Sequence, residues 1–196
     1  MQKQVTRGIP HSDYLVIFFS FIFGYVVFEF LSGWAEIIRN LKLGDIYWIH
    51  LAWTVLAFIL VVQSWWGMWA QKELIAAGFG SFFFTLIIPI LYYFLSIVLF
   101  PSINRIRDSG YEMYFFGNKH FIFGVLAIII AYLVLNDYCY LNKDIRCREN
   151  KIRIPAIVFL TVLAVTGNIY CHILLMLSCC FLLLYFIIRF RVRLSS

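Results

Sequence analysis

Long apolar segments alternate with short polar segments along the whole chain. The clearest apolar segment covers residues 47–69, YWIHLAWTVLAFILVVQSWWGMW, and carries Tyr or Trp at both ends. A helix of this length is about 30 Å long, which is the thickness of the hydrocarbon core of a membrane. Aromatic rings with a polar edge favour the two membrane–water interfaces. The segment therefore predicts a transmembrane helix.

The same pattern predicts five further helices, which together form one domain over residues 1–196. In chain order, the six predicted helices cover residues 14–34, 47–69, 74–100, 120–138, 154–165 and 169–188. The polar connections between them are predicted at residues 35–46, 70–73, 101–119 and 139–153, with a turn at 166–168. Residues 154–165 extend only about 18 Å as a helix. The last two segments therefore form either two full spans or a re-entrant hairpin that follows four spans.

The third predicted helix carries small residues near its start and two tyrosines near its end. Ala76, Ala77 and Gly80 are expected to allow close contact with a neighbouring helix. Tyr92 and Tyr93 are expected to anchor the helix at the membrane surface.

Composition places much of this chain in lipid. Of its 196 residues, 63% are hydrophobic and only 13% are charged, and the mean hydropathy is +0.88. A soluble domain of this length could not bury so much apolar surface. The predicted fold is an all-α integral membrane protein, a polytopic bundle of about six helices whose first partner is the lipid bilayer. Such a small bundle has little room for a gated pathway, so we expect a homo-oligomer or a membrane-protein complex.

The distribution of cations predicts the orientation of the bundle. With six spans, both termini lie on one side together with eleven of the sixteen Lys and Arg residues, and five lie on the other side. The positive-inside rule then places both termini in the cytoplasm, and we expect a bacterial inner membrane. No basic run with interleaved aromatic residues lies outside the apolar segments, so nucleic-acid binding is not expected.

Few polar residues lie inside the apolar segments, and each needs a partner or a function because polar groups are costly in lipid. Glu29 is the one acid inside the first predicted helix. In the six-helix topology His50, His120 and His172 all lie near the outer ends of their helices. Together with Glu29 they could bind a metal ion, relay protons or provide haem ligands. Gln63, near the inner end of its helix, is expected to hydrogen-bond to a neighbouring helix or to line a pathway.

Within these candidates, Glu29 and His50 are predicted to pair, because they lie at similar heights on consecutive helices. The alternative for each histidine is simple contact with water and lipid head groups. Beside them, Ser64 is expected to bond to a neighbouring helix. Asn136 and Asp137 end their helix and are expected to be exposed to the cytoplasm, with pairing of Asp137 to a cation of the charged stretch 139–153 as the alternative.

The sequence contains no motif of a soluble enzyme, such as a P-loop, GxSxG or HExxH. The five cysteines form no CxxC pair and follow no zinc-ligand spacing. We therefore expect a non-enzymatic membrane protein, either of the channel or transport type or a membrane subunit of a larger complex. The alternative is a membrane-bound redox or metal-dependent enzyme that uses Glu29 and the outer histidines. No particular cofactor or metal is identified by the sequence.

Overall fold

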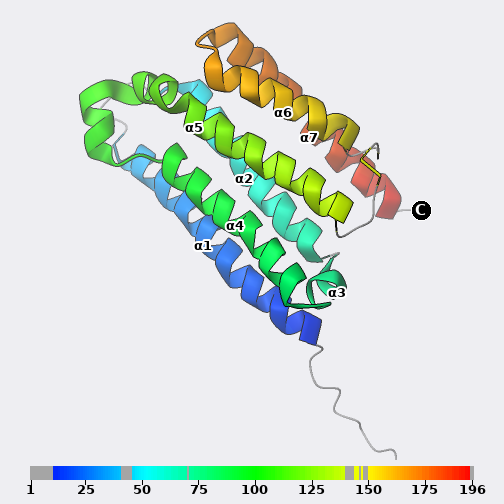
Figure 1. Cartoon of the computed structure of the whole chain (residues 1–196). Coiled ribbons are helices and arrows are strands. Elements are labelled where there is room, and N and C mark those ends of the chain that lie inside the picture. The colour runs from blue at the N-terminus through cyan, green and yellow to red at the C-terminus, as the bar shows by residue number, and fades with distance from the viewer. Residues whose placement is uncertain are drawn as a thin grey trace, which may run out of the picture.

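The structure, a computed structural model, describes residues 11–40, 46–69, 71–139, 144, 145, 147 and 150–194, with side chains except at residues 103, 107–109 and 182–194. The described residues form seven helices and no strand, which confirms the all-α prediction (Figure 1). The helices are α1 (His11–Arg39), α2 (Trp48–Trp69), α3 (Lys72–Ile75), α4 (Phe79–Leu99), α5 (Ile103–Cys139), α6 (Asn150–Val165) and α7 (Ile169–Leu194).

Four helical segments in the described part of the chain are long and apolar enough to cross a membrane. They are α1, α2, α4 and the segment Gly110–Cys139 of α5. Their outward-facing side chains are also apolar, as the 75% exposure of Phe21 on α1 shows. A helix that is apolar on all sides is stable at a protein surface only if that surface faces lipid. The helices therefore indicate a membrane-embedded protein.

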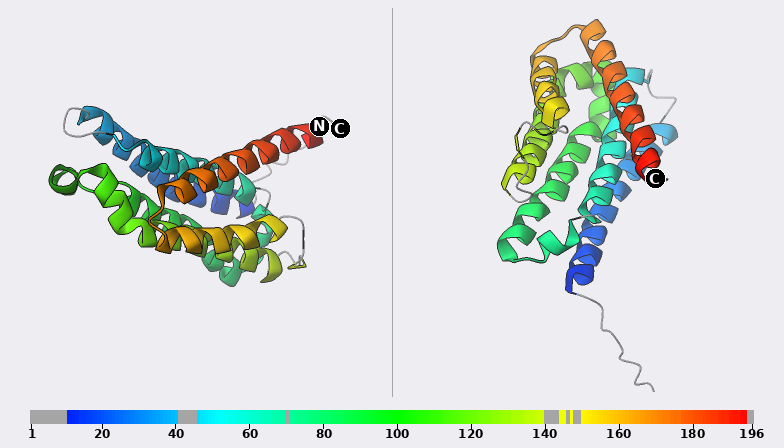
Figure 2. Two further views of the ribbon diagram at one scale, coloured as in Figure 1. Left: turned by 90° about the horizontal axis from the view of Figure 1, so that it is seen from above. Right: turned by 90° about the vertical axis from the view of Figure 1, so that its right-hand side faces the viewer.

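The helices form a bundle in which α1 contacts both α2 and α4, and α5 lies between α4 and α6. α6 and α7 diverge from their connecting turn, so that α6 packs along α5 whereas α7 lies against α2 (Figure 2). The turn after α4 and the turn between α6 and α7 lie at the same end of the bundle, opposite α3 (Figure 1). This arrangement leaves the inner faces of α2, α4, α5 and α6 directed toward a common space.

The inner face of α1 follows a regular spacing of three and four residues. Phe19, Phe23, Val26 and Phe30 are buried along it, while the indole N–H of Trp34 donates to the hydroxyl of Thr54 on α2 at 2.8 Å.

Several element boundaries differ from the sequence-based prediction. α1 continues to Arg39, α6 begins at Asn150 and α7 continues to Leu194, in each case a few residues beyond the predicted helix. Two differences are larger. Segment 101–119 was predicted as a polar connection, but it is helical from Ile103 and continues into the apolar part of α5 through a kink at Gly110. The predicted helix 74–100 is in fact two helices, since α3 ends at Ile75 and α4 begins at Phe79. The turn predicted at residues 166–168 is confirmed.

The small residues at the start of the third predicted helix do not form a helix contact. Ala77 and Gly80 are exposed, and no atom lies within 4 Å of the position that a Cβ on Gly80 would occupy. The prediction failed because the chain bends between α3 and α4, which turns these residues outward. The close contact occurs instead between Gly33 and Phe100.

A salt bridge and a hydrogen bond stabilise the end of the bundle that contains α3. The Lys72 ammonium lies 2.8 Å from Oδ1 of Asp13, and the Ser12 hydroxyl donates to the Glu73 carboxylate at 3.1 Å. The hydrogen bond to Asp13 raises the pKa of Lys72. These contacts connect the start of α1 to the connection between α2 and α4.

Candidate functional site

A cavity of about 350 Å³ lies between α2, α4, α5 and α6, with Phe23 of α1 and Cys179 of α7 also on its wall. Its volume lies at the lower end of the range for small-molecule sites, about 300–1,000 Å³. The cavity is only partly enclosed, so a molecule can enter it from outside the bundle.

α2 forms the longest wall of the cavity. Its lining residues recur every three or four positions from Trp53 through Leu60 and Gly67, and Gln71 continues the line just beyond the helix. At a rise of 1.5 Å per residue, Trp53 and Gln71 lie about 27 Å apart along the helix direction. The space beside Gly67 is open, because no atom lies within 4 Å of the position of a Cβ there.

The deep part of the cavity is apolar. Ile88 of α4 and Leu126, Ile130 and Leu133 of α5 face Phe23 and the α2 wall across it. Residues 126, 130 and 133 lie on one face of α5 because of their helical spacing.

Three hydroxyl groups lie in this wall: that of Thr85 donates to the carbonyl of Ser81 at 2.9 Å, and those of Ser64 and Tyr92 are bonded to each other. The Ser64 and Tyr92 oxygens are 2.8 Å apart, and the Tyr92 hydroxyl also donates to the carbonyl of Leu60 at 3.3 Å. The expected bond of Ser64 to a neighbouring helix is thus confirmed. Tyr92 is 1% exposed, so its predicted place as an anchor at the membrane surface is wrong. Its polar edge is satisfied inside the protein, because Ser64 of α2 faces it.

The end of the cavity near Gln71 is polar. Arg153 of α6 lines it together with Asn136 of α5 and Gln71, and the Asn136 amide donates to Oε1 of Gln71 at 3.3 Å. Nη1 of Arg153 lies 2.7 Å from Oδ2 of Asp137. The side chain of Asp137 is only 5% exposed, which makes its pairing with a cation necessary. The expected exposure of Asn136 and Asp137 is wrong, since both are buried, and the alternative, an ion pair between Asp137 and a cation of the following stretch, is the arrangement found.

Sequence reasoning did not identify Arg153 as a site residue. The sequence feature that could have indicated Arg153 is the pair Asn136-Asp137 at the end of an apolar helix, followed by a cation in the first turn of the next helix. The contact itself depends on the packing of α6 along α5, which places Arg153 beside Asp137.

The histidines at the opposite end of the bundle are held by backbone carbonyls and aromatic rings. Nε2 of His50 lies 2.8 Å from the carbonyl oxygen of Leu99, and the His50 ring stacks on Tyr111. Because a carbonyl only accepts, this nitrogen carries the proton. The predicted pairing of His50 with Glu29 is thus replaced by a bond to the end of α4.

His172 is also completely buried. Its Nε2 lies 3.1 Å from the carbonyl oxygen of Thr166, and its ring packs against Phe115, Phe116 and Phe123 at centroid distances of 5.3–5.6 Å. Its Nδ1 has no hydrogen-bond partner among the described residues.

His120 is exposed and packs against Phe121. His50 and His172 both contact the ring of Phe115, so the two histidines lie near each other, as their predicted similar height requires. Each ring nevertheless has its hydrogen bond to a backbone carbonyl.

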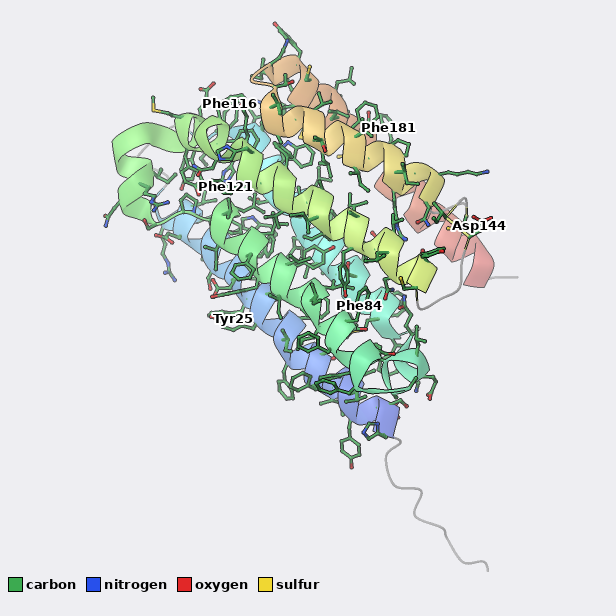
Figure 3. All side chains as sticks on the ribbon, viewed as in Figure 1. Tyr25, Phe84, Phe116, Phe121, Asp144 and Phe181 are labelled. Atoms are coloured by element: carbon green, nitrogen blue, oxygen red, sulfur yellow. The ribbon has the colours of Figure 1, made fainter. Side chains whose placement is uncertain are left out.

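Glu29 lies on the outer side of the bundle, half-buried between α1 and α4. Its carboxylate interacts with the hydroxyl of Tyr25, which also interacts with Tyr93. The Tyr25 ring lies 5.5 Å from that of Tyr93 and projects outward from α1 (Figure 3). Glu29 therefore has polar neighbours, but they are tyrosines and not the predicted His50.

The predicted site residues consequently separate into different environments. The described part of the chain contains no group of three or more His, Cys, Asp or Glu side chains that could bind a metal ion. Gln63 is the one predicted site residue on the wall of the large cavity. No protein-family model, curated protein or solved structure matches this chain.

Proposed function

We propose that this protein is a non-enzymatic integral membrane protein of the transport type, which takes a small amphiphilic molecule into the cavity beside α2. One observation carries the proposal: an apolar space of about 350 Å³ inside a membrane-embedded bundle ends at a polar group that contains Arg153. A molecule with an apolar body and a polar end matches both parts of this wall.

The proposed setting is a bacterial inner membrane, with six spans and both termini in the cytoplasm. The eleven-to-five distribution of cations supports this orientation. In this orientation the Arg153 end of the cavity lies near the cytoplasmic surface, since Gln71 belongs to a connection on that side. The bound molecule would enter or leave at that surface.

The proposal is tested by filling the cavity. Gly67→Leu adds an isobutyl group on the cavity wall, at a position where an added Cβ meets no atom within 4 Å. We expect the purified wild-type protein to retain a lipid-like molecule in native mass spectrometry and Gly67→Leu to lose it. Gly24→Leu is the matched control, because Gly24 is exposed on α1 and is likewise free of neighbours. Equal occupancy in all three proteins would contradict the proposal.

A second candidate function is that of a membrane subunit in a larger assembly. The observation in its favour is the polar group formed by Glu29, Tyr25 and Tyr93 on the outer side of α1 and α4. A carboxylate that faces lipid is costly, so a second helix bundle that covers this group is favoured. Glu29→Leu is then expected to reduce a homo-oligomer or complex to monomers in size analysis, while Glu29→Gln preserves it. A wild-type protein that is already monomeric in mild detergent would exclude a stable assembly.

The enzyme alternative depends on Glu29 and the outer histidines meeting at one site. Within the described residues these side chains bind separate partners. The cavity is therefore the feature on which the proposed function rests.

A further inference from the structure

We infer that the cavity binds a single-chain amphiphile with an anionic head group, held with its head at Arg153 and its chain along α2. This inference rests on the proposed function, since it names the class of molecule that the same cavity takes.

The shape of the cavity favours one long chain. Its lining extends along α2 from Trp53 to Gln71, about 27 Å of helix direction. An unbranched alkyl chain can follow a lining of this length.

The hydroxyl groups inside the wall do not require a polar ligand at mid-depth. Ser64 and Tyr92 bond to each other, and Tyr92 bonds further to the backbone of α2. Thr85 donates to the carbonyl of Ser81. These hydrogen bonds are satisfied within the protein, so an apolar chain can pass the hydroxyl groups without leaving a buried donor unpaired. The remaining polar side chain on this part of the wall, Gln63, is exposed.

The head-group end is defined by Arg153. It is the one charged residue among those described on the cavity wall, and the amides of Gln71 and Asn136 lie beside it. A guanidinium group binds carboxylate and phosphate oxygens through two parallel N–H bonds. Both hydrogen bonds described for Arg153, to Asp137 and Asn150, come from Nη1. Its other N–H donors have no partner among the described residues.

Asp137 keeps Arg153 stable when the cavity is empty. Its carboxylate is not part of the cavity wall, and it binds the guanidinium at 2.7 Å. The Asp137 side chain is only 5% exposed, so an unpaired charge there would be costly, and the ion pair removes that cost while fixing the direction of the guanidinium group. Asp137 is therefore a positioning residue for the head-group site.

The position of Arg153 relative to the bilayer agrees with this class of ligand. Gln71 lies in the connection after α2, outside the four membrane-spanning segments of the described chain. A head group beside it lies at the membrane surface, while the chain extends toward Trp53 at hydrocarbon depth. A membrane amphiphile adopts the same arrangement in the bilayer itself.

The test compares three probes with the same alkyl chain: palmitate, hexadecyl phosphate and hexadecanol. Binding to the purified full-length protein is measured by displacement of radiolabelled palmitate. We expect the two anionic probes to bind about tenfold more tightly than the alcohol, because only they form charge-assisted hydrogen bonds with Arg153. A preference for palmitate assigns a fatty acid, and a preference for the phosphate assigns a lysophospholipid-like ligand.

Two variants locate the head group. Arg153→Gln combined with Asp137→Asn removes both charges without leaving one unpaired, and it is expected to bind all three probes with similar affinity. Lys151→Gln is the matched control, since Lys151 is an exposed cation two residues earlier on α6, and it should retain the preference for anions.

The outcomes separate this inference from the proposed function. If hexadecanol binds the wild-type protein as tightly as palmitate, and Gly67→Leu abolishes the binding of both, the anionic head group is wrong while the cavity remains a binding site. If no probe binds, or if Gly67→Leu binds all three unchanged, both proposals fail.

Discussion

Gly33 and Phe100 form the tightest contact around any glycine that the structure describes. A Cβ on Gly33 would lie 2.2 Å from the Cγ and Cδ1 atoms of the Phe100 ring. The ring cannot easily move away, because Phe30 and Trp34 pack against it from α1. The absence of a side chain at position 33 therefore sets the distance between α1 and the end of α4.

Gly33→Ala should destabilise the protein by about 1–3 kcal/mol, the usual cost of forcing extra atoms into a packed site. The measurement is thermal or denaturant unfolding in mild detergent. Gly24→Ala, on the same helix but without neighbours within 4 Å, corrects for the change in helix propensity. If both variants unfold together with the wild type, the contact between α1 and α4 is not as close as described.

At the scale of elements, α5 shows how a polar segment can still be helical. Ile106, Tyr111 and Tyr114 are buried in a cluster with Ile37 of α1, and the Tyr114 hydroxyl donates to the carbonyl of Val98 at 2.8 Å. The intervening Arg105, Glu112 and Met113 are exposed. One buried face is enough to stabilise the helix, since tertiary packing outweighs local composition.

Gly110 allows α5 to change direction between its polar and apolar parts. Its φ of 75° and ψ of 163° lie in a region that L-residues rarely adopt. Gly110→Ala should therefore destabilise the protein by about 1–3 kcal/mol through backbone strain.

Gly117→Ala is the control for this prediction, because Gly117 is exposed on the same helix, is equally free of neighbours and has no positive φ. Unfolding of both variants is compared with that of the wild type. A stability of Gly110→Ala equal to that of Gly117→Ala would show that the kink is not required.

At the scale of the whole molecule, the C-terminal pair of helices determines the topology. α6 and α7 flank the bundle on different sides, α6 along α5 and α7 along α2 (Figure 2). α6 has 16 residues, about 24 Å of helix, which is short for a full crossing. Whether the pair crosses the membrane twice or dips into it from one side does not change the cavity, because both helices reach it in either case.

For six spans, reporter fusions after Gln71 and at the C-terminus should give cytoplasmic signals, and fusions after Ser102 and Gly167 should give external signals. The Gly167 fusion separates the alternatives: an external signal requires that α6 crosses the membrane. A cytoplasmic signal from this fusion would instead support four spans with a re-entrant hairpin. Equal signals from the Gln71 and Ser102 fusions would contradict both topologies.

Much of the architecture could be predicted because helix formation in lipid depends on local sequence. Apolar segments of sufficient length must form helices there to satisfy their backbone hydrogen bonds. The membrane-spanning parts of α1, α2, α4 and α5, and the turn at residues 166–168, were therefore recognisable in the sequence. The burial of Asp137 was not, because a carboxylate at the end of an apolar helix is expected to be exposed unless a neighbouring helix covers it.

The candidate site could be predicted only in part. Gln63 lies on the cavity wall as a pathway residue would, but Glu29 and the histidines pointed to a shared site that the described residues do not form. The position of a residue along a helix axis follows from counting residues. The direction in which its side chain points around the axis cannot be predicted when every side of the helix is apolar.

The sequence by itself determined that this chain forms helices of membrane-spanning length, where most of them begin and end, and which polar residues need partners. Tertiary structure alone decided that His50 binds Leu99, that residues 103–109 and 111–119 are helical on either side of the kink at Gly110, and that Arg153 lies at the end of an apolar cavity. The physical reason is that lipid accepts the apolar outer surface of a helix as readily as the protein core does. Hydrophobicity therefore cannot select the inward face, and only the packing of side chains between helices does.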